Sequence, residues 1–414
     1  YVYFNSNSIY SQLGDSSYAI DGLVLPFLML TAFLMPLTII SNWNIKNPLL
    51  MILLTALGLI LQLNFTVLNQ ISFYVYFEVA LIPLFILVGI FGAKNRITAA
   101  YYVLIYTLAS SLFMLLSISL YNGLLNTTDF YTLSYANFSL DVQSLLWILA
   151  FVGIAVKTPI MPVHTWLPVV HSESPLSGSV LLAGVVLKLA IFAIFRLLLP
   201  TLELATLLFV PFIMTLAVIT IFWSSLVTLR QTDMKVLIAY SSISHMAVCI
   251  IAVLANSEIG LLGGIMLGIA HGLVSPALFI AVGGILYDRY HQRLVWYYQG
   301  LNQFMPIFTI YLVIFSLANI GTPLTANFIG ELMSFVGAFN KNVVIGSLAV
   351  FSVLLSAAYQ MRLTNRLTGG VKSASLDVTS DLTRRETFMM LFLLLPTIYL
   401  GICPDYINNI CSAS

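Results

Sequence analysis

The stretch GIAVKTPIMPVHTWLPVVHSESPLSGSVLLAGVVLKLA, residues 153–190, decides how the rest of the sequence is interpreted. It places two lysines, Lys157 and Lys188, among apolar residues of the kind that fill a membrane span. Three prolines follow Lys157 closely and are expected to break the helix there. A lysine at bilayer depth costs roughly 2.5–3.5 kcal/mol on insertion scales. A chain that keeps two such lysines beside a broken helix is therefore expected to use them.

The composition places the chain in a lipid bilayer. Of its 414 residues, 60% are hydrophobic and 7% are charged, whereas a soluble domain carries about 25% charged residues. The net charge of +1 gives no indication of a nucleic-acid partner. The sequence contains no glycine-rich phosphate loop after a strand, and its three cysteines lack the spacing of a metal site. We therefore expect an integral membrane protein without a soluble domain.

Stretches of about 20 apolar residues mark membrane-spanning helices. Breaks are expected in the fifth and tenth spans, because KTPIMP (157–162) carries two prolines and GTPLTAN (321–327) a glycine and a proline. Breaks in matching positions of two halves are typical of inverted repeats. We predict an all-α polytopic membrane protein with two inverted five-helix repeats, each with one discontinuous helix. The twelve expected spans are 20–40, 49–68, 71–92, 98–121, 142–167, 175–199, 204–228, 234–256, 259–287, 305–337, 343–363 and 386–403.

The whole chain, 1–414, is expected to form a single integral membrane domain. Its expected parts are a flanking helix (20–48), a first repeat (49–199), a second repeat (204–363) and a C-terminal helix (386–403).

Basic residues gather on one side of the predicted membrane. The loops after odd-numbered helices hold twelve lysines and arginines, whereas the other side holds only Arg196 and Lys341. Basic loops stay on the negative side of a membrane. We therefore expect the odd-numbered loops to face the cytoplasm or matrix, and both termini to face the positive side.

A set of ionisable residues lies inside the apolar spans and provides the candidate site. A buried lysine releases its proton more readily than one paired with a carboxylate, so a Glu–Lys pair of changing spacing can act as a proton switch. Histidine can relay protons between such groups. The six candidates are Glu78, Lys157, Lys188, His245, His271 and Glu331.

Each candidate also has a structural interpretation. A buried Glu–Lys pair can tie helices together without moving protons. Function is favoured for the lysines and glutamates, because charges inside a membrane are costly. For His245 and His271 the alternative of a hydrogen-bonded packing residue stays open. We expect only structural or solvated surface roles for five further groups: His164, His171, Arg230, Asp233 and Lys235.

These segments resemble a known family. Residues 152–190 look like the signature of the antiporter-like subunits of respiratory complex I and of Mrp-type cation/proton antiporters. LRQTDMKVLIAYSSISHMA (229–247) and MLGIAHGLVSPALF (266–279) match the second half of that signature. FEVALIPLFILVGIFG (77–92) and GTPLTANFIGEL (321–332) resemble one particular subunit of the mitochondrial complex. The resemblance extends from about residue 20 to the end of the chain.

The resemblance implies a proton-translocating membrane-arm subunit of NADH:ubiquinone oxidoreductase in the mitochondrial inner membrane. Glu78 and Lys157 would form the charge pair at which protons enter, and Lys188 would be the central relay. The two histidines would continue the polar axis, and Glu331 would be the protonatable group on the exit side.

The resemblance also implies what other chains provide. NAD, FMN, iron–sulfur clusters and ubiquinone are expected in other subunits, and this chain is expected to bind no metal and no cofactor beyond structural phospholipids. The chain would be part of a proton-translocating NADH:ubiquinone reductase without a redox site of its own. Its expected partners are other membrane-arm subunits, including two neighbouring antiporter-like subunits, together with accessory subunits and membrane lipids.

Two alternatives stay open at this point. One is a subunit of a bacterial respiratory or Mrp-type antiporter. The other is a structural membrane-arm subunit that pumps no protons. The full set of six ionisable residues argues against the second, because drift would replace costly charges by apolar residues. Members of the family usually have fourteen helices, so two helices ahead of residue 20 are expected to be absent, cleaved or separately encoded.

Overall fold

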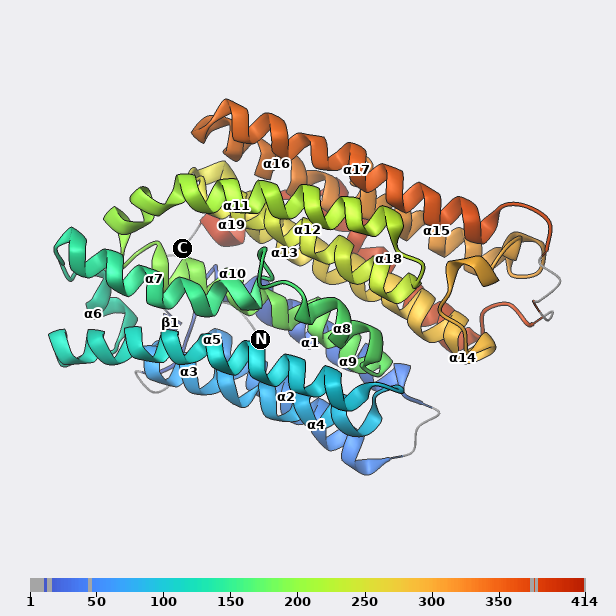
Figure 1. Cartoon of the computed structure of the whole chain (residues 1–414), viewed down its shortest axis with the longest axis horizontal. Coiled ribbons are helices and arrows are strands. Elements are labelled where there is room, and N and C mark those ends of the chain that lie inside the picture. Colours follow the sequence, from blue (N-terminus) through green and yellow to red (C-terminus); the bar gives the residue numbers. More distant parts are fainter. Residues whose placement is uncertain (1–10, 13–16, 44–46, 373–375, 377–378, 413–414) are drawn as a thin grey trace.

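The computed structural model describes residues 11–12, 17–43, 47–372, 376 and 379–412. The chain forms a bundle of helices that run lengthwise between the two ends of the molecule (Figure 1). In this described part, eleven helices are long and apolar enough to cross a membrane, and a broken twelfth span joins them. The predicted all-α polytopic membrane protein is confirmed, with spans close to the predicted ranges.

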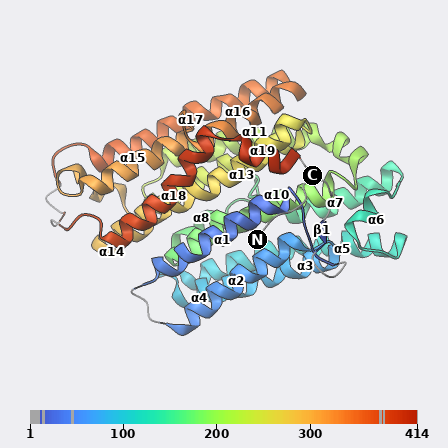
Figure 2. The same cartoon turned by 180° about the vertical axis from the view of Figure 1, so that it is seen from behind.

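The N-terminal half lies along one side of the bundle (Figures 1 and 2). A short antiparallel pair, β1 (Ser11–Gln12) and β2 (Ala19–Ile20), precedes its helices. The helices are α1 (Val24–Ser41), α2 (Pro48–Thr66), α3 (Gln70–Val79), α4 (Leu81–Phe91), α5 (Arg96–Leu125), α6 (Phe130–Ser134), α7 (Leu140–Lys157), α8 (Trp166–Glu173), α9 (Leu176–Leu181), the π-helix η1 (Leu182–Val186), α10 (Leu187–Ala193) and the π-helix η2 (Ile194–Leu198).

The C-terminal half lies along the other side, and its last helices return across the back of the bundle (Figure 2). The helices are α11 (Glu203–Arg230), α12 (Met234–Leu254), α13 (Glu258–Phe279), the π-helix η3 (Ile280–Leu286), α14 (Tyr287–Tyr290), the 3₁₀ turns η4 (Val295–Tyr297) and η5 (Leu301–Gln303), α15 (Pro306–Ile320), α16 (Ala326–Lys341), α17 (Val343–Thr368), α18 (Arg384–Ile402) and α19 (Asp405–Ser412).

Both predicted helix breaks occur. The first lies between α7, which ends at Lys157, and α8, which begins at Trp166. Proline lacks a main-chain N–H and cannot continue a helix, which explains the interruption. The second lies between α15 and α16, where Gly321 adopts a φ of +81° that favours glycine. The predicted span 142–167 is therefore α7 followed by a separate short helix, and 305–337 is two helices.

The centre of the bundle consists of α9–η2, α12 and α13–η3, whose residues are almost all buried. Close helix contacts depend on residues without side chains. A Cβ on Gly272 of α13 would lie 2.9 Å from the carbonyl oxygen of Gly184 in η1. Similarly, a Cβ on Gly330 of α16 would lie 2.7 Å from the Cα of Leu267 in α13. Small residues let helix backbones approach closely, and these contacts bring the polar groups of three helices together.

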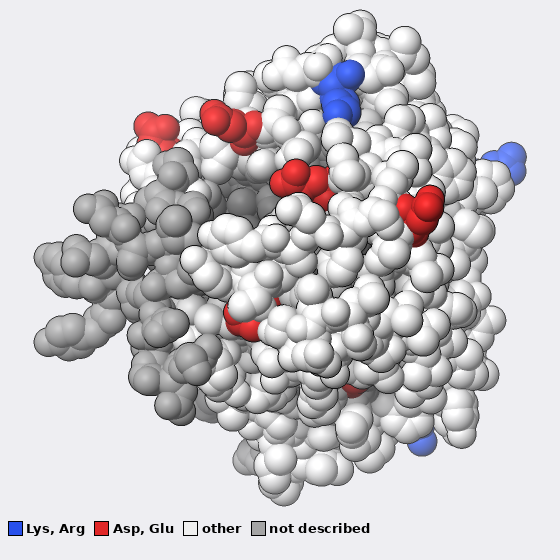
Figure 3. Space-filling model, turned by 90° about the vertical axis from the view of Figure 1, so that its left-hand side faces the viewer, with Lys and Arg blue, Asp and Glu red and all other residues white. Residues whose placement is uncertain are grey.

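The two ends of the bundle differ in charge, as the loop composition predicts. The end seen in Figure 3 has acidic groups spread over it and few basic ones. It carries the loops before α7 and between α16 and α17. The loops with most of the lysines and arginines lie at the opposite end, around α14.

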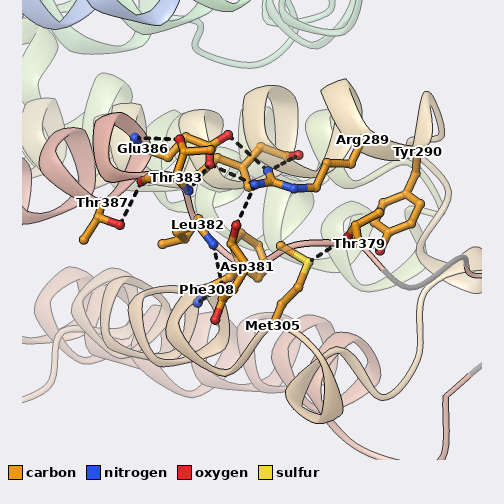
Figure 4. A network of polar contacts seen from close by, with 11 residues as sticks. Arg289, Tyr290, Met305, Phe308, Thr379, Asp381, Leu382, Thr383, Glu386 and Thr387 are labelled. Carbon is orange, nitrogen blue, oxygen red and sulfur yellow. Dashed lines mark hydrogen bonds and ion pairs between the residues drawn. The ribbon is translucent and has the colours of Figure 1, made fainter.

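An ion pair at this basic end ties α14 to α18 (Figure 4). Arg289 donates to both carboxylate oxygens of Glu386, at 3.1 and 2.8 Å. It also donates to the main-chain oxygen of Asp381, whose carboxylate accepts from the N–H groups of Ile307 and Phe308 at the start of α15. The long connection before α18 is thereby fixed to two helices.

Substitution of this arginine should destabilise the bundle. In Arg289→Gln the carboxylate of Glu386, with a side chain only 11% exposed, loses its bidentate partner. We expect a loss of about 3 kcal/mol, the lower end of the range for a broken buried pair. Thermal unfolding in mild detergent would measure it. The control is Arg366→Gln, an exposed arginine of the same end; an equal effect of the two changes would contradict this role of Arg289.

Candidate functional site

The pair of Glu78 and Lys157 lies where α3 meets α7. Lys157 is 1% exposed, and its Nζ donates to the main-chain oxygen of Phe77 at 3.1 Å. The same Nζ lies 3.1 Å from the centroid of the Phe77 ring, in a cation–π contact. One buried oxygen of the Glu78 carboxylate has no hydrogen-bond partner. Glu78 interacts electrostatically with Lys157, but among the described residues the two form no ion pair within 4.0 Å. The structure thus brings them together without direct contact.

Lys188 lies at the centre of the bundle and is completely buried. Its Nζ donates to the main-chain oxygen of Ala183, which lies in the π-helix η1. π-Turns occur often at functional sites, and here the turn carries the carbonyl that the lysine needs. The same Nζ lies 2.8 Å from Nδ1 of His271 on α13. Gly184 of η1 and Gly272 of α13 are in close contact. Because Gly184 follows Ala183 and Gly272 follows His271, this contact brings both partners of Lys188 together.

His271 continues the polar contacts of Lys188 towards α12 and α16. The ring centroids of His271 and His245 are 5.7 Å apart, a separation that one water-mediated hydrogen bond can span. Nδ1 of His245 lies 3.1 Å from Oε1 of Glu331. Each histidine has its Nε2 buried and without a partner. We call these four residues, Lys188, His271, His245 and Glu331, the central row.

Glu331 packs against the break between α15 and α16. The α16 helix carries it back towards Gly321, where a Cβ would lie 2.6 Å from its Oε2. Glu331 is 6% exposed. The break therefore supplies the space for the carboxylate, while α13 and α16 touch through glycines to hold it beside α12. In the described part of the chain, no hydrogen bond or ion pair joins the Glu78–Lys157 pair to the central row.

Lys235 is a further buried lysine, and its predicted solvated position is wrong. It is 5% exposed, and its Nζ donates to the main-chain oxygen of Ser174 at 2.6 Å. It lines a cavity of about 470 Å³ at the basic end of the bundle, together with Glu173, Asp288 and Arg293. The residue begins α12 but its side chain turns inwards, beneath the connection from α8 to α9.

His171 is buried on α8 and interacts with Lys235 and with Lys188 of the central row. Its ring stacks on Phe279 with centroids 4.6 Å apart, which fits the predicted structural role. However, both ring nitrogens are buried without a hydrogen-bond partner, and the ring interacts electrostatically with Lys235 and Lys188. His164, also predicted to be structural, packs edge-on against Tyr240.

Two further buried polar side chains, one on α16 and one on α17, were not predicted from the sequence. Tyr359 and Asn327 are completely buried, and their polar atoms have no hydrogen-bond partner. Within the described ranges, no three His, Cys, Asp or Glu side chains are grouped so that they could hold a metal ion.

Comparison with known proteins identifies the family. The transmembrane model of the NADH:quinone oxidoreductase/Mrp antiporter family matches residues 68–356. NADH-ubiquinone oxidoreductase chain 4 of Candida albicans is 56% identical over 393 residues, covering 95% of this chain and 85% of the relative. Chain 4 of Yarrowia lipolytica is 52% identical over 396 residues, covering 95% and 82%.

Solved structures agree with these relatives. A chain of respiratory complex I from Thermus thermophilus with bound NADH superimposes with a TM-score of 0.90 at 26% identity, covering 98% of this chain and 88% of that one. A chain of the Mrp complex from Dietzia has a TM-score of 0.88 at 17% identity, covering 96% and 83%, and supports the fold alone. The fold and the buried charges define an antiporter-like membrane subunit. The chain belongs to the NADH:quinone oxidoreductase/Mrp antiporter family, which confirms the resemblance seen in its sequence.

The space beside Glu331 should tolerate no side chain at residue 321. In Gly321→Ala the alanine would have to adopt a strained φ of +81°. Its methyl group would also collide with the carboxylate of Glu331. We expect a loss of about 1–3 kcal/mol of stability and displacement of Glu331 from His245. A cryo-EM structure would test whether the 3.1 Å contact is lost. Gly123→Ala is the control, because no atom lies within 4 Å of a Cβ there; an intact contact in Gly321→Ala would refute the prediction.

Proposed function

We propose that this chain is a proton-translocating membrane-arm subunit of an NADH:ubiquinone oxidoreductase in the mitochondrial inner membrane. The observation that carries the proposal is the central row, in which Lys188, His271, His245 and Glu331 follow one another inside a membrane bundle at 2.8 Å, 5.7 Å between rings, and 3.1 Å. The chain-4 relatives are named as parts of this enzyme. The redox chemistry of that enzyme would take place in other subunits, which would hold NAD, FMN, iron–sulfur clusters and ubiquinone.

The central row has the chemistry of a proton relay. The Lys188 ammonium donates, and the Nδ1 atom of His271 faces it. A neutral imidazole accepts a proton on one nitrogen and releases one from the other. The free Nε2 atoms of both histidines would then meet through water, and Nδ1 of His245 would deliver a proton to Glu331. Each transfer exchanges one hydrogen bond for another, so no charge has to be left unpaired in lipid.

Protons would reach the row from the basic end of the bundle. The cavity beside Lys235 has this buried lysine in its wall, and His171 interacts electrostatically with both Lys235 and Lys188. The Glu78–Lys157 pair would act as a switch, because a change in their separation changes how firmly the lysine holds its proton. Glu331 would release protons towards the positive side.

The orientation of the chain in the membrane follows from the basic loops. Their accumulation around α14 favours the matrix for this end and the intermembrane space for the other. Both chain ends would then lie on the positive side, although residues 1–10 and 413–414 are outside the described part. The chain would consist of two inverted five-helix repeats, and the two helix breaks support this division.

The partners would be other membrane-arm subunits, among them two antiporter-like neighbours. Long helices at the edges of the bundle support this, because α5 and α11 each present a row of exposed apolar side chains. A bacterial or Mrp-type antiporter subunit shares the fold, but the chain-4 relatives exceed 50% identity and favour the mitochondrial enzyme. Isolation of a single chain that pumps protons by itself would contradict the proposal.

Loss of the switch pair should impair pumping without preventing assembly. In Lys157→Ala or Glu78→Ala we expect coupled proton translocation by the assembled complex to fall by at least about tenfold, since positioned acid–base groups contribute at least this much. Lys157 is buried and Glu78 is half-buried beside it, so assembly on native gels should change less. Lys341→Ala, at the exposed end of α16, is the control. Normal pumping by an assembled Lys157→Ala complex would make this lysine structural.

Glu331 should need a titratable group. Glu331→Gln keeps the shape and the hydrogen bonding but cannot take up and release a proton, so pumping should fall by roughly tenfold or more in an assembled complex. Glu331→Asp should retain part of the activity. If Glu331 only neutralises a neighbouring positive charge, the Gln variant should lose stability and not pumping. Proton translocation per assembled complex, measured in both variants, separates these outcomes, and full pumping in the Gln variant would remove Glu331 from the path.

A further inference from the structure

Unsatisfied polar atoms occur on α16 and α17, the helix of Glu331 and the one that follows it. The hydroxyl of Tyr359 on α17 and both amide atoms of Asn327 on α16 are buried without a hydrogen-bond partner, and so is Nε2 of Gln360. The Gln360 side chain contacts Asn319 at the end of α15, with its Oε1 accepting at 3.4 Å. A buried polar atom without a partner costs about 1–3 kcal/mol. Several of them on these two helices call for a functional explanation.

Tyr359 is the member of this group best placed to act. Its side chain is completely buried, and its hydroxyl lies beside the hydroxyls of Ser241 and Ser244 on α12. The same hydroxyl interacts electrostatically with Glu331. Tyr359 is therefore close both to this serine pair, which precedes His245 by four residues and by one residue, and to the carboxylate that His245 contacts.

The serines can accept a hydrogen bond but have no free proton to give. Ser241 donates to the main-chain oxygen of Ile238, and Ser244 donates to that of Ser241, both at 2.7 Å. The Tyr359 hydroxyl carries a single proton, so it can donate to a serine or to Glu331 but not to both. Rotation about the C–O bond is enough to exchange these acceptors, because hydroxyl hydrogens turn freely.

We propose that Tyr359 is a further residue of the proton path, whose hydroxyl switches between Glu331 and the pair Ser241–Ser244. This inference rests on the proposed function. A hydrogen bond to a carboxylate stabilises its charged form. When Tyr359 donates to Glu331, the carboxylate stays ionised; when the hydroxyl turns to the serines, the carboxylate takes the proton that His245 holds on Nδ1. Tyr359 keeps its own proton throughout, and one proton moves from His245 to Glu331.

A purely structural role gives the opposite expectation for Tyr359→Phe. The variant keeps the ring and removes an unpaired buried hydroxyl, so a structural tyrosine would become neutral or more stable, with unchanged pumping. As a switch, Tyr359→Phe should lower the rate of proton translocation by about 3- to 10-fold, the effect of one lost hydrogen bond. The control is Tyr101→Phe, which removes the hydroxyl of an exposed tyrosine on α5 and should leave the rate unchanged.

The experiment compares four assembled complexes reconstituted in vesicles: wild type, Tyr359→Phe, Glu331→Gln and the double variant. Because Tyr359 acts through Glu331, the double variant should pump no more slowly than Glu331→Gln alone. An unchanged rate in Tyr359→Phe, or losses that multiply in the double variant, would overturn the inference. Impaired Glu331→Gln with normal Tyr359→Phe would overturn only this inference, whereas normal Glu331→Gln would overturn the proposed role of Glu331 itself.

A second variant covers the case in which Tyr359→Phe does not assemble. The combined change Ser241→Ala and Ser244→Ala removes both acceptors of the tyrosine hydroxyl, and α12 should stay intact, since each serine hydroxyl donates to a main-chain oxygen of its own helix. This variant should also lower the rate of proton translocation, by holding the tyrosine on Glu331. A wild-type rate in it would count against the switch.

Discussion

The constraint on which the structure depends is that an ammonium group in the middle of a membrane needs partners supplied by the protein. Lys188 is completely buried and finds two, the carbonyl of Ala183 and the ring of His271. The carbonyl belongs to a π-turn in the same span as Lys188, and the histidine belongs to α13, which contacts that turn through glycine. The cost of a desolvated charge is thus offset by local backbone irregularity. The central row follows from this requirement, because each partner of a buried polar group needs a partner in turn.

The two helix breaks solve the same problem for the remaining charges. Freed backbone groups are tolerated at membrane depth only where they are buried in protein or face water. The break after Lys157 ends α7 at the charged residue, and the break at Gly321 leaves room for the carboxylate of Glu331. Charge and irregular backbone therefore occur together. This arrangement explains why prolines and glycines close to ionisable residues were informative in the sequence.

Features that depend on apolar length and on costly charges could be predicted from the sequence. The spans, both breaks and the placing of six ionisable residues within the helix bundle required only hydropathy and the rarity of charges in lipid; their role as a site stays a prediction. Lys235 was misjudged because it begins a helix beside two other charges, a pattern typical of a membrane interface, and only the packing of the segment around Ser174 buries it. Tyr359 was missed because a tyrosine in an apolar helix carries no charge signal. The sequence in which His271 and His245 follow Lys188 in the central row depends on contacts between helices, which no local sequence pattern predicts.

The glycine contacts between α13 and α16 have a mechanical consequence. Backbones meet at Gly330 and Leu267, and again at Gly260 and Gly337, so closely that a Cβ on either glycine of α16 would collide with the backbone of α13. The contact therefore acts as a spacer of minimal thickness between the helix that carries His271 and the helix that carries Glu331. Any side chain larger than hydrogen at these glycines would widen the gap between the two helices, and the polar groups that they carry would separate with them.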